Sequence, residues 1–353
     1  MSSSGNGLET FNLGDFKLES GEILTGALLA YKTYGDPQNA AIINPTWYTG
    51  SVHDCAKNFS SSNVSLNPSQ YFIVVPALFG NGESTSPSNR PDLGENFPTV
   101  TFADNVHAQY RLLTEKLGVK HAKAVVGWSM GAAQSYQWAV QYPDFMDCIA
   151  PICGSAKTAI HNNVFLEGVK SALIAARGGT SLGIGKGQQY PSSSPWTTEQ
   201  RVVGLKALGR VYAGWGFSQP WYRHNHYTHF GARDAEDFIV KFWETWALTN
   251  DPEDALVMLR TWQLGDISAL PQFGGDLKKA LGSIKAKAVL APCKTDLYFP
   301  PEDSEVEVDN MPKGRATLSV IPSIWGHWAG GPGDSKEDWA FLDEQMGRLL
   351  SEV

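Results

Sequence analysis

The 353-residue chain is long enough for one large or two smaller domains, and its composition, 42% hydrophobic and 18% charged, is ordinary for a globular protein. A net charge of −8 argues against nucleic acid and anionic membranes as partners. There is no apolar run of about eighteen residues and no secretory pattern at the amino terminus, so we expect a cytoplasmic protein without a transmembrane helix.

The first part of the chain alternates between apolar runs and a helical pattern. Apolar runs predict strands over residues 23–34, 41–44 and 71–75, and the spacing of apolar residues predicts a helix over residues 103–117. Residues 80–98 form a long polar loop between them, of a length often found in functional loops. We also expect the four cysteines to be buried free thiols rather than a disulfide framework.

A strand–turn–helix segment near the middle of the sequence contains a candidate catalytic nucleophile. A short buried strand over residues 123–126 leads into a G-x-S-x-G motif at residues 127–131, and a helix follows over residues 132–142. A nucleophile elbow requires this context, and its glycines avoid a collision with neighbouring backbone in a sharp turn. We therefore expect Ser129 to be a nucleophile at the positive end of a helix, rather than an ordinary turn serine.

The alternation continues and then stops. A strand over residues 147–153 and a helix over residues 157–176 complete a pattern that predicts an α/β fold with a mostly parallel sheet flanked by helices. The segment from Trp196 to Trp262 is instead predicted to be helical, and it holds six tryptophans. Some of these should line a pocket or an oligomer surface.

The domain boundaries follow from this change of pattern. We predict a helical cap domain over residues 178–275, inserted into a core domain formed by residues 1–177 and 276–353. After the cap, strands are expected over residues 286–291 and 316–321. Helices are expected over residues 301–310 and 335–350.

A nucleophilic serine needs a base, and the base needs an acid that orients it. His327 follows the last predicted strand and Asp296 the strand before it, so both lie at strand carboxyl ends, where open α/β sheets gather their sites. The chain order Ser129, Asp296, His327 is the one expected for an α/β-hydrolase triad. Asp303 is the alternative acid; Asp296 could also be a turn residue, and His327 a loop residue packed among tryptophans.

A tetrahedral intermediate is stabilised by two backbone N–H donors. Met130, directly after the nucleophile, should supply one, and Tyr48 or Trp47, in the loop after the second predicted strand, should supply the other. We predict that the side chains of Trp47, Trp128 and Trp328 line the substrate pocket, although simple aromatic packing explains such residues equally well.

Two further patterns are weak. His224, His226 and His229 resemble a metal cluster, but no carboxylate completes the set, and the first two would share a face only on a strand. The glycine-rich segment 183–187 lacks the spacing of a phosphate-binding loop. We expect no metal and no nucleotide cofactor.

The chain over residues 20–350 resembles the homoserine O-acetyltransferase-like branch of the α/β-hydrolase superfamily. The matching pieces are residues 48–50, 127–131, Gln134, Trp138, 142–143, 296–301 and 326–327. The resemblance implies an α/β-hydrolase fold, an acyl-Ser129 intermediate, a helical cap over the triad and, in many members, a homodimer formed through the caps.

The chain also departs from that branch. Its acetyltransferases usually carry Asp directly after the catalytic His, where it helps to hold the amino group of the acceptor; here that position is Trp328. Trp128, Ala132 and Ala133 stand where the family commonly has glycine. An indole does not neutralise an ammonium group, so we expect a less polar substrate than homoserine.

The sequence thus favours a hydrolase that cleaves an ester or thioester of a small, fairly apolar metabolite through acyl-Ser129. The first alternative is an O-acyltransferase that uses acetyl-CoA or another acyl-CoA as co-substrate and an alcohol other than homoserine as acceptor. The others are carbon–carbon bond chemistry on the same residues and a ligand-binding protein with a decayed triad.

Overall fold

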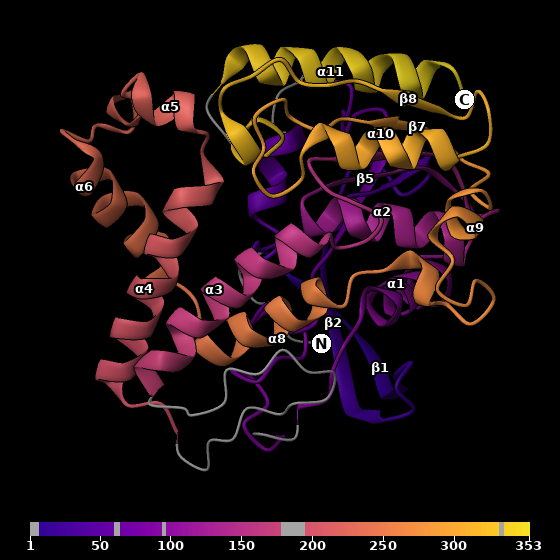
Figure 1. Ribbon diagram of the computed structural model, residues 1–353. Coiled ribbons are helices and arrows are strands. Elements are labelled where there is room, and N and C mark those ends of the chain that lie inside the picture. Colours follow the sequence, from indigo (N-terminus) through magenta and orange to yellow (C-terminus); the bar gives the residue numbers. More distant parts are fainter. Residues whose placement is uncertain (1–6, 60–63, 94–96, 178–194, 332–334) are drawn as a thin grey trace.

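The computed structural model describes residues 7–59, 64–93, 97–177, 195–331 and 335–353 (Figure 1). Its strands are β1 Glu9–Lys17, β2 Ile23–Tyr34, β3 Ala41–Ile43, β4 Phe72–Pro76, β5 Ala122–Trp128, β6 Met146–Ile152, β7 Lys287–Leu290 and β8 Ala316–Leu318. Its α-helices are α1 Phe102–Arg111, α2 Met130–Gln141, α3 Ile160–Arg177, α4 Thr198–Gly216, α5 Gln219–Arg223, α6 Ala235–Phe238, α7 Thr245–Leu248, α8 Pro252–Gln263, α9 Leu277–Leu281, α10 Pro301–Asn310 and α11 Lys336–Ser351.

The strands form an eight-stranded sheet in the order β1-β2-β4-β3-β5-β6-β7-β8. From β4 to β8 neighbouring strands are parallel, whereas β1 and β2 are antiparallel additions at one edge. The parallel part places the carboxyl ends of β3, β5, β7 and β8 at one edge of the sheet, which is where sites gather in this class of fold. The mostly parallel α/β fold predicted from the sequence is confirmed.

The sheet is buried on both faces, because alternate residues of its central strands enter different hydrophobic clusters. Val126 of β5 belongs to one cluster with Leu349 of α11, and Val125 belongs to the other with Val106 of α1. Fully covered parallel strands explain the nearly continuous apolar runs in the sequence. The first cluster continues into the aromatic residues of the helices between α4 and α8.

The region after α3 is helical, as predicted, and α4, α5 and α6 project to one side of the molecule (Figure 1). Helix α3, which the sequence assigned to the core, packs against both α4 and α8. The boundaries of the cap domain stay a prediction, and its first residues, together with the glycine-rich segment 183–187, lie outside the described residues.

Two local differences from the sequence prediction have simple causes. Strand β1 was not predicted, because its bulged pairing with β2 interrupts the apolar alternation at Gly14. Helix α1 passes into a π-helical turn at Leu112–Lys116, which the helical periodicity does not distinguish. All four cysteines are buried and unpaired. Among the helices of the described ranges, none combines the length and apolarity that crossing a membrane requires.

Candidate active site

Ser129 lies in the tight turn between β5 and α2, with φ 58° and ψ −123°. A non-glycine residue in this region is strained by about 1–3 kcal/mol, and the neighbouring glycines allow the turn. A Cβ at Gly127 would lie 2.1 Å from the carbonyl oxygen of Gly131, and one at Gly131 would lie 2.8 Å from that of Pro45. The close approach predicted for both glycines is therefore present. The Ser129 N–H donates to the carbonyl oxygen of Ile152 at 3.0 Å and ties the turn to β6.

The structure brings Ser129, His327 and Asp296 into one hydrogen-bonded series. His327 Nε2 lies 2.9 Å from Ser129 Oγ, and His327 Nδ1 lies 2.8 Å from Asp296 Oδ2. All three residues are buried. With the Nδ1 proton donated to the carboxylate, Nε2 is left to accept the serine proton. Asp303, the alternative acid, begins α10 and makes no hydrogen bond to His327.

The acid and the base are held by their own loops. Asp296 Oδ1 accepts the backbone N–H groups of Tyr298 at 2.8 Å and Phe299 at 3.2 Å. His327 lies in a 3-10 turn, Gly326–Ala329, and the N–H of Gly326 donates to Thr295 Oγ1 at 3.2 Å. Because Thr295 directly precedes Asp296, this bond fixes the loop after β7 against the loop after β8. No pattern in the sequence indicates this role of Thr295.

The two candidate oxyanion donors lie on segments that one side chain holds together, the start of α2 and the loop after β3. Gln134 Nε2 donates to the carbonyl oxygens of Thr46 at 2.9 Å and Met130 at 3.1 Å, so it links the loop after β3 to the start of α2. The N–H groups of Met130 and Tyr48 donate to no other residue in the described part of the chain, and the N–H of Trp47 does not either. Both positions of the predicted loop donor therefore stay open to a substrate oxygen.

Gln134 belongs to a buried network that sequence reasoning missed. Its Oε1 accepts from Gln109 Nε2 at 2.6 Å, and Gln109 Oε1 accepts from Trp138 Nε1 at 2.8 Å. The resemblance had singled out Gln134 and Trp138 only as matching residues. Each amide group in this chain of bonds is partnered, which stiffens the support beneath the loop after β3 that carries Trp47 and Tyr48, called the oxyanion loop below.

The three predicted pocket tryptophans lie around His327. Trp128 stacks on the imidazole with ring centroids 4.8 Å apart, and its Nε1 donates to the backbone oxygen of His327 at 3.1 Å. Trp47 and Trp328 meet Trp128 edge-on at 5.0 and 5.7 Å. Trp328 also packs against Trp243 at 5.0 Å. Their contact with a substrate stays a prediction. Trp128 and Trp328 contact the ring of His327 directly, whereas Trp47 contacts Trp128.

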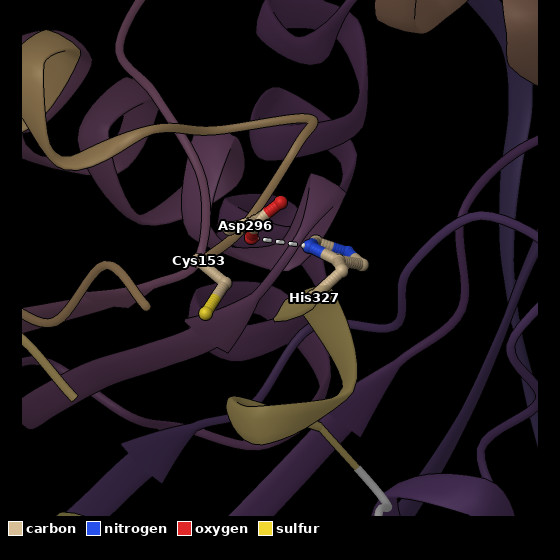
Figure 2. A group of neighbouring side chains, drawn as sticks. All are labelled: Cys153, Asp296 and His327. Atoms are coloured by element: carbon tan, nitrogen blue, oxygen red, sulfur yellow. Dashed lines mark hydrogen bonds and ion pairs between the residues drawn. The ribbon is translucent and has the colours of Figure 1, made fainter. Parts of the chain in front are cut away.

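Cys153 is the third member of a compact group with Asp296 and His327 (Figure 2). The possible ligand atoms of these residues lie within 4.8 Å of one another, and no other such group of three occurs in the ranges that the structure describes. Burial, and then the Asp296 carboxylate, raise the pKa of the Cys153 thiol well above its usual range. A neutral thiol is a poor metal ligand, and the imidazole and carboxylate are bonded to each other, so the group fits a triad better than a metal centre.

The histidines near α5 are not arranged as a metal cluster. His226 and His229 stack with their Nδ1 atoms 3.3 Å apart in an exposed 3-10 turn, and the ring centroids of His224 and His226 are 6.3 Å apart. No carboxylate joins them among the residues described.

Comparisons with known proteins identify the family of the chain. The family described as alpha/beta hydrolase fold matches residues 42–172. A probable esterase of Corynebacterium glutamicum is 34% identical over 325 residues, covering 90% of this chain and 89% of the relative. The ethyl acetate hydrolase of Pseudomonas veronii is 34% identical over 349 residues, covering 97% and 95%. A solved structure of the acetyl esterase MekB superposes with a TM-score of 0.88 at 34% identity, covering 98% and 96%.

Relatives at lower identity include the homoserine O-acetyltransferase of Haemophilus influenzae, 27% identical over 350 residues, covering 90% of this chain and 92% of the relative. The resemblance noted in the sequence is therefore confirmed, with esterases at higher identity than the acetyltransferases. The chain is an enzyme of the α/β-hydrolase family and belongs to the branch that contains both activities.

Proposed function

We propose that the protein is a serine esterase that hydrolyses short-chain esters of small, fairly apolar alcohols through an acyl-Ser129 intermediate. The observation that carries this proposal is the pair of contacts from His327, 2.9 Å to Ser129 Oγ and 2.8 Å to Asp296 Oδ2. Relatives named acetyl esterase and ethyl acetate hydrolase support the short acyl group and the small alcohol.

The first half of the reaction acylates the enzyme. His327 Nε2 takes the Ser129 proton as Oγ attacks the ester carbonyl carbon, while Asp296 stabilises the imidazolium that forms. The N–H groups of Met130 and Tyr48 stabilise the oxyanion of the tetrahedral intermediate, a contribution of about 10²–10³-fold for one donor. When the intermediate collapses, His327 gives the proton to the departing alcohol oxygen.

The second half of the reaction hydrolyses acyl-Ser129 and regenerates the free enzyme. Water attacks the acyl carbon of acyl-Ser129, His327 takes a proton from that water, and the carboxylic acid leaves as the proton returns to Ser129 Oγ. The environment of Trp328 favours water over an amino-acid acceptor, because this side chain packs against the rings of Trp243 and Phe217. An ammonium group placed there would lose water without gaining a carboxylate partner.

Acyl transfer remains the second candidate, since the homoserine O-acetyltransferase relatives share most of the chain length. In that case acetyl-CoA or another acyl-CoA would be the co-substrate and an alcohol without an amino group the acceptor. The two reactions differ in the fate of the acetyl group. Release of free acetate indicates hydrolysis, and formation of an acetyl ester of the added alcohol in place of free acetate indicates transfer.

Replacement of the nucleophile tests the proposal. Ser129→Ala should lower kcat/KM for ethyl acetate, measured by acetate release, about 10⁴–10⁶-fold. Ser69→Ala, which changes an exposed serine, should leave it unchanged. Loss of less than a tenth of the activity in Ser129→Ala would show that another group is the nucleophile.

A further inference from the structure

Two tyrosine hydroxyls beside the triad are buried without a hydrogen-bond partner among the described residues. Tyr212, on α4, is 4% exposed, and Tyr298, two residues after Asp296, is 1% exposed. A buried hydroxyl gives up its bonds to water, so folded proteins nearly always supply it with another partner. An unpartnered pair of this kind at a catalytic site indicates that the partner is a bound molecule.

Two buried tyrosines away from the triad do have partners. The Tyr31 hydroxyl donates to Glu9 Oε2, and the Tyr136 hydroxyl donates to Glu307 Oε2. Tyr34 also lacks one, but it pairs with Ile73 near the amino end of β4, at the opposite edge of the sheet from the triad. Tyr34 therefore offers a matched control for removal of an unpartnered hydroxyl.

The pair lies between the base and the oxyanion loop. The Tyr298 ring meets the His327 ring edge-on, with centroids 4.7 Å apart. The Tyr212 ring stacks on Tyr48, with centroids 5.6 Å apart and an interplanar angle of 7°. The centroids of Tyr212 and Tyr298 are 6.0 Å apart, so the two side chains are direct neighbours.

The residues around the two hydroxyls favour a neutral acceptor oxygen over a carboxylate. Burial raises the pKa of both phenols well above the usual range; the neighbouring phenol of Tyr48 adds to this for Tyr212, and the Asp296 carboxylate adds to it for Tyr298. Both hydroxyls are therefore neutral donors at physiological pH. The ring of Phe165 packs against both tyrosines, and the ring of Trp215 stacks on that of Tyr298. A carboxylate buried among such rings would cost more free energy than an ether, hydroxyl or ketone oxygen.

We propose that the hydroxyls of Tyr212 and Tyr298 bind a neutral acceptor oxygen of the substrate that lies outside its ester group. The enzyme then selects oxygen-bearing esters over hydrocarbon esters of the same length. This inference rests on the esterase function proposed above, and it makes both tyrosines specificity-determining residues rather than part of the triad.

Isosteric substrates in which one oxygen replaces one methylene test this selection. On the alcohol side, 2-methoxyethyl acetate is compared with butyl acetate; on the acyl side, ethyl methoxyacetate is compared with ethyl butanoate. The ratio of kcat/KM within each pair is measured for wild type, Tyr212→Phe, Tyr298→Phe and the control Tyr34→Phe. Differences in intrinsic reactivity cancel when the ratios of the variants are compared with that of the wild type.

We expect Tyr212→Phe and Tyr298→Phe each to lower the ratio about threefold to tenfold in one of the two pairs, the size of one hydrogen bond. The hydrocarbon ester of that pair should keep its kcat/KM within about twofold, and Tyr34→Phe should keep the wild-type ratio. The pair that responds identifies the side of the substrate that carries the oxygen.

Unchanged ratios in both tyrosine variants, or equal losses on both members of a pair, would overturn the inference while leaving the esterase function intact. A wild type that hydrolyses none of the four esters, or that is matched by Ser129→Ala, would overturn the proposed function and this inference with it.

Discussion

Polar side chains on the two sides of Ser129 differ in their hydrogen bonding. The sheet side is represented by Gln109 and Gln134, and the cap side by Tyr212 and Tyr298. On the sheet side, Gln134 and Gln109 use their amide groups in a continuous network that supports the oxyanion loop. On the cap side, aromatic rings pack against one another, and the hydroxyls of Tyr212 and Tyr298 have no partner within the described residues. A fully bonded network holds catalytic groups in place, whereas unpartnered donors are available to a substrate. In the account proposed here, the reaction type depends on the sheet side, and substrate choice depends on the cap side.

After the nucleophile itself, the largest effect should come from the acid of the triad. Asp296→Asn should lower kcat/KM for ethyl acetate about 10⁴-fold, because an amide favours the wrong tautomer of His327. Asp303→Asn, which changes the alternative acid, should cost less than about threefold. Thermal unfolding of both variants checks that the fold is kept. A larger loss in Asp303→Asn than in Asp296→Asn would reverse the assignment.

A smaller effect should come from the support of the oxyanion loop. Gln134→Ala removes the bonds that hold the Thr46 carbonyl against the start of α2. It should lower kcat about 10–100-fold with little change in KM. This loss is smaller than the one expected when an oxyanion donor itself is removed. Gln137→Ala is the matched control, because among the described residues the amide of this buried side chain bonds only to Gln141, in the same helix. If both variants lost kcat to the same extent, Gln134 would have no special role in positioning the loop.

Substitution of Glu307 should have the smallest effect on activity, but it should change the pH dependence of stability measurably. Burial raises the pKa of this carboxyl to about 8, although the Tyr136 hydroxyl and the Ala156 N–H, which donate to it, act in the opposite direction. Since the folded pKa lies above the unfolded value near 4.5, the native state binds the proton more tightly. The contribution of Glu307 to stability is therefore complete below about pH 4.5 and is lost progressively as the pH rises to about 8.

Glu307→Gln should flatten this pH dependence. The free energy of unfolding of the wild type should fall by a few kcal/mol more than that of the variant between pH 5 and pH 8, measured in urea. Parallel curves for the two proteins would show that Glu307 titrates near its ordinary pKa in the folded state.

Local signals explain what could be predicted from the sequence. Ser129, Asp296 and His327 could be selected because each follows a predicted strand, and parallel strands bring their carboxyl ends together. The Gln109–Gln134 contact joins separate helices, and no periodicity marks it. The pairing of Tyr212 with Tyr298 depends on how α4 packs against the loop after β7, which propensity and patterning leave undetermined. Only the tertiary arrangement shows which buried hydroxyls are left without partners.

The most direct test of the account is detection of the covalent intermediate. Wild-type protein mixed with p-nitrophenyl acetate and quenched in acid within milliseconds should gain one acetyl group, and peptide mass spectrometry should place it on Ser129. Ser129→Ala treated in the same way should gain none. An acetyl group on another residue, or turnover with no acetyl-enzyme at any quench time, would contradict the assignment of Ser129 as the nucleophile.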